Sequence, residues 1–163
     1  MYSKGHFGLT LLITSLSMIP FGYNEMFVII IFLSAGLSSL PDIDMELRKK
    51  KISIMGKPIE IHHRGRTHSI LFALIVGVLF GLLFYYGIGT FLWFGVGFVS
   101  GFMGVVCHLI GDTFTYHAFK PLWPFSQKEI SLGLCYAGDR SVNEGLMGLG
   151  FVGFVLYIIL TTR

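Results

Sequence analysis

Five long apolar runs, almost free of charge, constrain the fold of this chain more than any other feature of its sequence. A helix needs roughly 20 mostly apolar residues to cross the hydrocarbon core of a bilayer. The runs cover about residues 7–23, 26–40, 67–86, 90–112 and 145–160. Hydrophobic residues make up 53% of the chain and charged residues only 13%, which is more apolar than soluble domains are. We therefore predict a single all-α domain over residues 1–163, an integral membrane bundle of about five transmembrane helices.

Lysine and arginine predict how the bundle is oriented. Seven of the twelve basic residues stand between positions 45 and 66, and short loops with such an excess usually face the cytoplasm. Five alternating spans then bring four more to the same side: Lys4, Lys120, Lys128 and Arg140. Only Arg163 falls outside. The sequence thus predicts a cytoplasmic amino terminus in a multi-pass inner-membrane protein. No aromatic or nucleic-acid motif accompanies the basic loop, so we expect no nucleic-acid partner.

Histidines and aspartates gather at the helix ends that this topology places in the cytoplasm. Ionisable side chains are costly to bury in a membrane and usually mark a functional or internally paired site. The set is His6, Asp42, Asp44, His63, His68, His108 and Asp112. Such a mixture of imidazole and carboxylate suits zinc or manganese. Seven ligands exceed the three of a typical catalytic zinc, so either two ions bind or some residues orient the ligands.

Local spacing supports the set in part. His108 and Asp112 are four apart and share one helix face, although Asp112 could instead be only a helix-end residue. Pro41 disfavours continued helix, and in an extended segment Asp42 and Asp44 would point the same way. An acidic helix-ending turn explains that pair equally well.

The segment that contains His63 and His68 also carries two arginines. Gly65 permits a turn and Thr67 suits an N-cap, so His63 is expected to fold back beside His68. The guanidinium groups of Arg64 and Arg66 fit a phosphate or carboxylate, or they act only as topology signals. We expect Arg66 to contact the substrate and Asp44 to serve as a ligand or general base. His6 is the weakest ligand, because a position at the interface would explain it too.

Glycine spacing indicates close helix packing. Gly77 and Gly81, and likewise Gly97 and Gly101, stand four apart, which lets helix backbones approach closely. The pattern allows contact within one chain or a homo-oligomer. Between the fourth and fifth runs, residues 125–138 are more polar, and we expect this segment to anchor at the interface near Trp123 or to form a lid.

The ordered motifs resemble one family. They are His6, Pro41-Asp42-Ile43-Asp44, His63-Arg64-Gly65-Arg66-Thr67-His68-Ser69 and His108-Leu109-Ile110-Gly111-Asp112, and their order is similar to that of the membrane-bound metal-dependent hydrolases that include the YdjM-like inner-membrane proteins. The likeness reaches to about Pro124. It implies a multi-spanning helical protein with hydrolase activity, whose site is formed by Asp42, Asp44, His63, His68, His108 and Asp112.

These observations favour a metal-dependent hydrolase at the cytoplasmic leaflet, which acts on a phosphate ester or a lipid through metal-activated water. Membrane lipid is thus an expected partner. Two alternatives remain: a metal-ion transporter, and a structural or regulatory membrane protein whose polar cluster is satisfied internally. A transporter would carry ligands near the bilayer midplane and polar residues along a path to the outer face.

Overall fold

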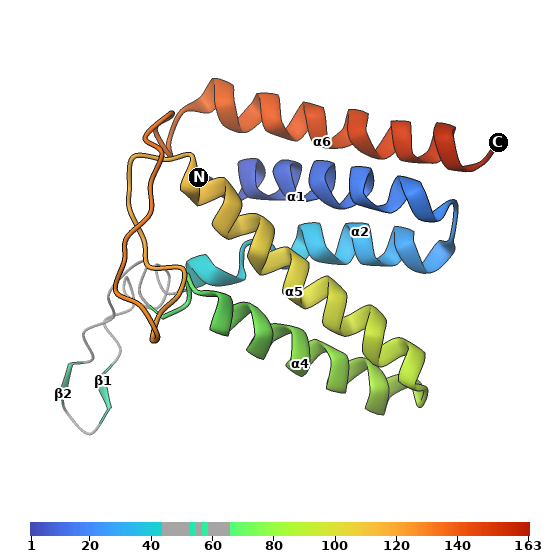
Figure 1. Ribbon diagram of the computed structural model, residues 1–163, viewed down its shortest axis with the longest axis horizontal. Coiled ribbons are helices and arrows are strands. Elements are labelled where there is room, and N and C mark those ends of the chain that lie inside the picture. The colour runs from blue at the N-terminus through green and yellow to red at the C-terminus, as the bar shows by residue number, and fades with distance from the viewer. Residues whose placement is uncertain (44–52, 55–56, 59–65) are drawn as a thin grey trace.

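The computed structural model describes residues 1–43, 53–54, 57–58 and 66–163, and in this part of the chain five helices lie side by side (Figure 1). They are α1 (Ser3–Met18), α2 (Glu25–Leu37), α4 (Ile70–Ile88), α5 (Phe91–Thr113) and α6 (Arg140–Thr161). The 3-10 helices η1 (Ile19–Phe21) and η2 (Leu40–Asp42) follow α1 and α2. Strands β1 (Ser53–Ile54) and β2 (Lys57–Pro58) form a short antiparallel pair. The prediction of an all-α membrane bundle is confirmed.

Four of the five helices are long and apolar enough to cross a membrane. The segments are Glu25–Asp42, Ile70–Ile88, Phe91–Thr113 and Arg140–Thr161. The remaining helix, α1, has 16 residues and continues into η1, which contains Pro20. Large apolar side chains on the outward faces, such as Leu83 at 62% and Val155 at 53%, are exposed. Apolar surface of this extent on two helices is suited to lipid.

Two glycine pairs bring α4 and α5 into backbone contact. A Cβ atom on Gly101 would lie 2.9 Å from the carbonyl oxygen of Val76, and one on Gly97 would strike the carbonyl oxygen of Phe80. Gly77 and Gly81 face the same interface, against Phe98 and Phe94. The glycine spacing seen in the sequence is therefore used within one chain. The homo-oligomer stays a prediction, and these faces do not supply its interface.

Successive helices alternate in direction, so five helix ends meet at one end of the bundle (Figure 1). These are the starts of α1, α4 and α6 and the ends of α2 and α5. The chain's last residue, Arg163, lies at the opposite end. This alternation is what brings residues from distant parts of the sequence to one place.

The segment between α5 and α6 folds back on itself beside this end of the bundle. Phe119 and Ile130 exchange backbone hydrogen bonds of 3.3 and 2.9 Å, and Leu134 donates to Phe114 at 2.9 Å. Phe119 is 2% exposed and packs in the core formed by α4 and α5, whereas Phe125 is 86% exposed. The backbone N–H of Ile70 donates to the carbonyl of Pro121, which ties the segment to the start of α4.

Candidate metal centre

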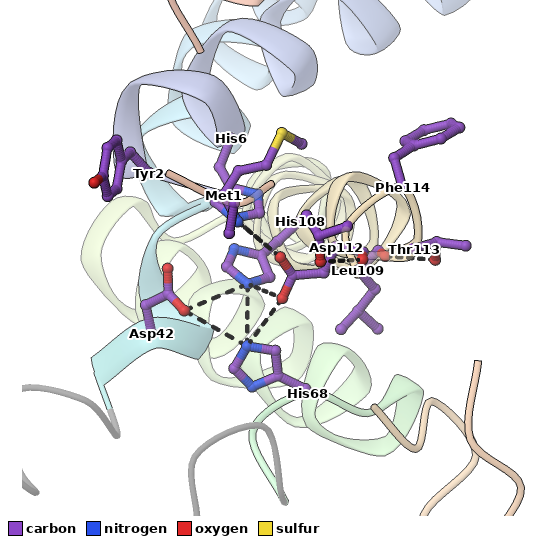
Figure 2. A network of polar contacts seen from close by, with 12 residues as sticks. Met1, Tyr2, His6, Asp42, His68, His108, Leu109, Asp112, Thr113 and Phe114 are labelled. Carbon is purple, nitrogen blue, oxygen red and sulfur yellow. Dashed lines mark hydrogen bonds and ion pairs between the residues drawn. The ribbon is translucent and has the colours of Figure 1, made fainter. Parts of the chain in front are cut away.

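Five of the seven predicted ligands meet at the shared end of the bundle (Figure 2). His6 comes from α1, Asp42 from η2, and His108 and Asp112 from α5, while His68 stands just before α4. Four of the five side chains are at most 1% exposed, and Asp42 is 17% exposed. The other two predicted ligands, Asp44 and His63, lie outside the residues that the structure describes.

Two histidine nitrogens occupy the centre of the cluster. Nε2 of His108 lies 3.3 Å from Nε2 of His68. Nε2 of His68 is 3.5 Å from Oδ1 of Asp42 and 3.4 Å from Oδ2 of Asp112. The corresponding distances from Nε2 of His108 are 3.7 and 3.5 Å. Two donor atoms that bind one ion at about 2.0–2.2 Å are themselves about 3.0–3.5 Å apart, so the spacing matches a shared cation better than strong hydrogen bonds.

A backbone carbonyl fixes the orientation of His108. Its Nδ1 lies 2.6 Å from the carbonyl oxygen of Ser38, which can only accept, so Nδ1 carries the proton. In the neutral ring Nε2 then presents its lone pair to the cluster, as metal-binding histidines do. The carbonyl is available because α2 tightens into η2 around Pro41: the N–H of Asp42 donates to Ser39 and not to Ser38.

His6 lies at the carboxylate oxygen of Asp112 that does not face His68 and His108. Its ring is fully buried and stacks on the ring of His108, with centroids 3.7 Å apart. Neither ring nitrogen has a hydrogen-bond partner among the described residues, and Nε2 lies 3.5 Å from Oδ1 of Asp112. A buried imidazole without a hydrogen-bond partner is costly unless something binds it. His6, the weakest ligand by sequence, is thus well placed for an ion.

The start of α4 differs from the sequence prediction. Ser69, and not Thr67, caps the helix, because its side chain accepts from the N–H of Phe72 at 3.2 Å. His68 therefore stands in the turn before the helix, where Oγ1 of Thr67 lies 3.1 Å from its Nδ1. Burial alone would lower the pKa of His68, but the carboxylates of Asp112 and Asp42 outweigh it and raise the pKa above the ordinary histidine value.

The sequence left an extended segment and a helix-ending turn open after Pro41, and the structure shows the turn. Leu40–Asp42 form a 3-10 helix, and Ile43 keeps helical dihedral angles of −59° and −26°. Asp42 therefore reaches the cluster from a helical turn and not from an extended strand, while Asp44 lies outside the described residues. The sequence could not choose, because proline fits the first turn of a helix as well as a strand.

Arg66, predicted to contact substrate, lies two residues before His68 and is exposed. Its guanidinium carbon stands 5.5 Å from the ring centroid of Trp123, a cation–π arrangement. Glu144, near the start of α6, is also exposed and pairs with Arg140 at 2.8 Å. Neither residue belongs to the groups of potential metal ligands found in the described part of the chain.

Two backbone groups at the site were not predicted from the sequence. One is the carbonyl of Ser38 described above. The other is the amino group of Met1, which lies 2.9 Å from Oδ1 of Asp112 and is buried with it (Figure 2). Pro41, which ends α2 near Ser38, is the only sequence signal that could have pointed to the first. The second follows from how α1 packs on α5.

The donor set fits a divalent cation. Two overlapping groups have ligand atoms within 4.8 Å of one another, His6 with His108 and Asp112, and Asp42 with His68 and His108. Imidazole nitrogen and carboxylate oxygen suit zinc or manganese, and the buried carboxylate of Asp112 needs a cation or an equivalent partner. Because His108 belongs to both groups, the arrangement has donors for one ion or for two neighbouring ions.

Fold and site together define a multi-pass helical membrane protein with a buried cluster of histidine and aspartate at one end. The chain belongs to the YdjM inner membrane protein family, whose model matches residues 1–162. This match confirms the resemblance seen in the motifs and extends it through the last helix. No curated protein and no solved structure matches the chain.

Proposed function

We propose that this protein is a metal-dependent hydrolase that acts on phosphate-ester or lipid substrates at the cytoplasmic face of the membrane. The observation that carries the proposal is the convergence of five ionisable side chains, four of them almost fully buried, from four separate parts of the chain. Membrane proteins rarely bury so many without a functional reason. The cluster also lies at a bundle end, where a polar substrate can reach it.

The residues have distinct parts in this proposal. His68, His108, Asp42 and Asp112 would hold the cation, and His6 would either orient Asp112 or bind a second ion. A zinc or manganese ion, when bound, would lower the pKa of a water molecule and polarise the substrate oxygen. Ser38 keeps Nε2 of His108 directed into the site. Asp44 would accept a proton from water, and Arg66 would pair with the phosphate oxygens.

Orientation and span number belong to the same proposal. Lys4, Arg66, Lys120, Lys128 and Arg140 belong to the helix ends and loops at the cluster end of the bundle, and Arg163 lies at the other end (Figure 1). The positive-inside bias then puts the cluster in the cytoplasm. For this topology α1 must cross as well. Sixteen α-helical residues and three 3-10 residues span about 30 Å together, which is enough for the hydrocarbon core.

The experiment combines metal analysis with an esterase panel. Purified wild-type protein is expected to retain zinc or manganese in stoichiometric amount and to release phosphate or fatty acid from at least one ester. His108→Ala is expected to lose both properties, because His108 belongs to both ligand groups. His117→Ala, a histidine outside the cluster, is the matched control. Wild-type protein that retains metal but hydrolyses no ester would refute the proposed hydrolase activity. Wild-type protein that retains no metal would refute the proposed metal site.

Metal-ion transport is a second candidate, and one observation favours it. The hydroxyls of Ser15 and Ser34 are buried and have no hydrogen-bond partner among the described residues. Buried hydroxyls of this kind could solvate a path from the cluster into the bundle. Other buried hydroxyls, such as those of Thr14 and Ser100, bond to carbonyls of their own helices. Uptake of zinc or manganese into proteoliposomes, without hydrolysis, would decide for transport.

A further inference from the structure

In the described part of the chain, one residue of the cluster has a side chain that is partly exposed. The side chain of Asp42 is 17% exposed, whereas those of His6, His68, His108 and Asp112 are at most 1% exposed. Asp42 also lines a cavity of about 350 Å³, a volume within the range of ligand pockets. In the described structure, the cluster is therefore reached by way of Asp42 and this cavity.

The cavity lies between two helices and extends toward the bilayer. Tyr2 and Ser3 at the start of α1 form one wall, and Gly36, Ser39 and Asp42 at the end of α2 and in η2 form the other. Gly36 belongs to the membrane-crossing segment Glu25–Asp42. It precedes Asp42 by six residues, or about 9 Å along a helix. The cavity thus joins a carboxylate of the site to the depth of the apolar layer.

The deeper part of the cavity is open and apolar. A Cβ atom on Gly36 would meet nothing within 4 Å. One turn further from the site, on the same face of α2 and next to the cavity lining, Phe32 is 40% exposed. This surface belongs to a membrane-crossing segment, where lipid hydrocarbon surrounds it. An acyl chain can lie along it without passing through water, whereas a small water-soluble ester has no part that fits it.

We infer that the substrate is a membrane phospholipid that enters sideways between α1 and α2. Its phosphate lies at Asp42 and the metal ligands, and one acyl chain lies along Gly36 and Phe32. This inference rests on the proposed function, because it names the substrate class of the same site. The cavity serves to bring an ester bond from the lipid phase to the cluster without releasing the lipid into water.

Photolabelling tests the inference independently of catalysis. The protein is reconstituted in phosphatidylcholine vesicles that contain phosphatidylglycerol with a diazirine in one acyl chain. We expect labelling of residues 32–43 that excess unlabelled phosphatidylglycerol displaces, while labelling of the lipid-facing surface of α6 stays constant. Gly36→Leu fills the open space and is expected to reduce the displaceable labelling about fivefold or more. Equal labelling of Gly36→Leu and wild type overturns the inference.

Matched variants keep this result interpretable. Gly148→Leu is the control, because Gly148 is also an exposed helical glycine with nothing within 4 Å of its Cβ position, and its labelling is expected to equal that of wild type. Gly36→Ala fills less space and should give an intermediate loss. Gly and Leu differ in helix propensity by less than about 1 kcal/mol in favour of Leu, so both leucine variants are expected to fold.

Hydrolysis rates supply the second arm. Gly36→Leu is expected to lower the kcat/KM for a long-chain phospholipid about tenfold more than that for bis(p-nitrophenyl) phosphate, because this soluble ester has no chain to lie along Gly36. An equal loss of kcat/KM for both esters would contradict entry of the lipid between α1 and α2. Absence of hydrolysis of either ester by wild type refutes the proposed function, and the photolabelling then decides on the lipid site alone.

Discussion

At the scale of single residues, Asp112 separates two environments within the cluster. Its Oδ2 faces the nitrogens of His68 and His108 at 3.4 and 3.5 Å, whereas its Oδ1 faces His6 at 3.5 Å and the amino group of Met1 at 2.9 Å. The first environment gathers four potential ligands, and the second depends on His6. The two histidines His68 and His6 should therefore differ in their importance for metal binding.

This difference can be measured as metal affinity. His68→Ala removes a ligand at the centre of the cluster and is expected to abolish stoichiometric metal. His6→Ala is expected to weaken affinity about 10- to 100-fold, the usual cost of losing a residue that orients a ligand. Titration of metal-free protein with zinc, followed by calorimetry, gives both values. If the two variants lose affinity equally, His6 is itself an essential ligand.

The raised pKa of His68 predicts opposite pH dependences for metal-free and metal-bound protein. In metal-free protein, protonated His68 pairs with Asp112 and Asp42. Its contribution to stability is full below the unfolded pKa of about 6.5 and is lost as the pH rises through the folded pKa. Metal requires the unprotonated ring, so metal affinity rises over the same range.

Thermal unfolding between about pH 6 and pH 8 tests this sign. With a chelator present, the unfolding temperature is expected to fall as the pH rises, and the extra stability conferred by added zinc is expected to grow. The same series on Asp42→Asn, which removes one carboxylate beside His68, should show a smaller decrease. A chelated protein that gains stability with rising pH would contradict the assignment of His68.

At the scale of secondary structure, the change from α2 to η2 places both a ligand and an orienting group. Pro41 lies in the first turn of η2, which turns Asp42 into the cluster and frees the carbonyl of Ser38 for His108. Pro20 occupies the same position in η1, at the other end of the bundle. The two prolines are locally alike, but only Pro41 borders the cluster.

Replacing these prolines separates the two roles. Pro41→Ala lets α2 continue, so the N–H of Asp42 competes for the carbonyl of Ser38. We expect metal affinity to drop about 10- to 100-fold, with an effect on unfolding temperature similar to that of Pro20→Ala. Pro20→Ala should leave metal affinity unchanged. Isothermal titration and thermal unfolding check these outcomes, and unchanged affinity in Pro41→Ala would rule out η2 as the positioning element.

At the scale of the whole molecule, alternation of five helices decides whether the cluster exists at all. If α1 failed to cross, its start and the end of α2 would no longer share a membrane face, and His6 would be separated from Asp42. In the structure His6 and His108 stack directly, and α1 packs on α2, α5 and α6. The bundle therefore agrees with five crossings, although α1, with 16 residues, is shorter than each of the four candidate spans.

Cysteine labelling tests this topology in cells. In a background without Cys107 and Cys135, Ser126→Cys lies between α5 and α6 and Thr162→Cys lies after α6. A membrane-impermeant maleimide added outside is expected to label Thr162→Cys in intact cells and Ser126→Cys only after permeabilisation. Lys4→Cys should behave like Ser126→Cys. Labelling of Lys4→Cys from outside would show that α1 does not cross.

The sequence by itself determined the class of fold and most of the candidate ligands. Apolar length specifies a membrane helix without reference to other parts of the chain, so the runs that became α2, α4, α5 and α6 were correctly located. Histidine and aspartate at helix ends are conspicuous in such a chain because burial there is costly. His108 and Asp112 could even be paired from spacing alone, and the structure keeps that pair.

Only the tertiary structure decided how these residues combine. The contact of His108 with the carbonyl of Ser38, the stacking of His6 on His108 and the cavity at Gly36 each depend on how separate helices pack. The local conformation after Pro41 was also left open by the sequence, because proline suits both a 3-10 turn and an extended segment. Local patterns specify which groups are expensive to bury, whereas packing determines which groups they meet. For this protein, that packing turns scattered ionisable residues into one candidate site.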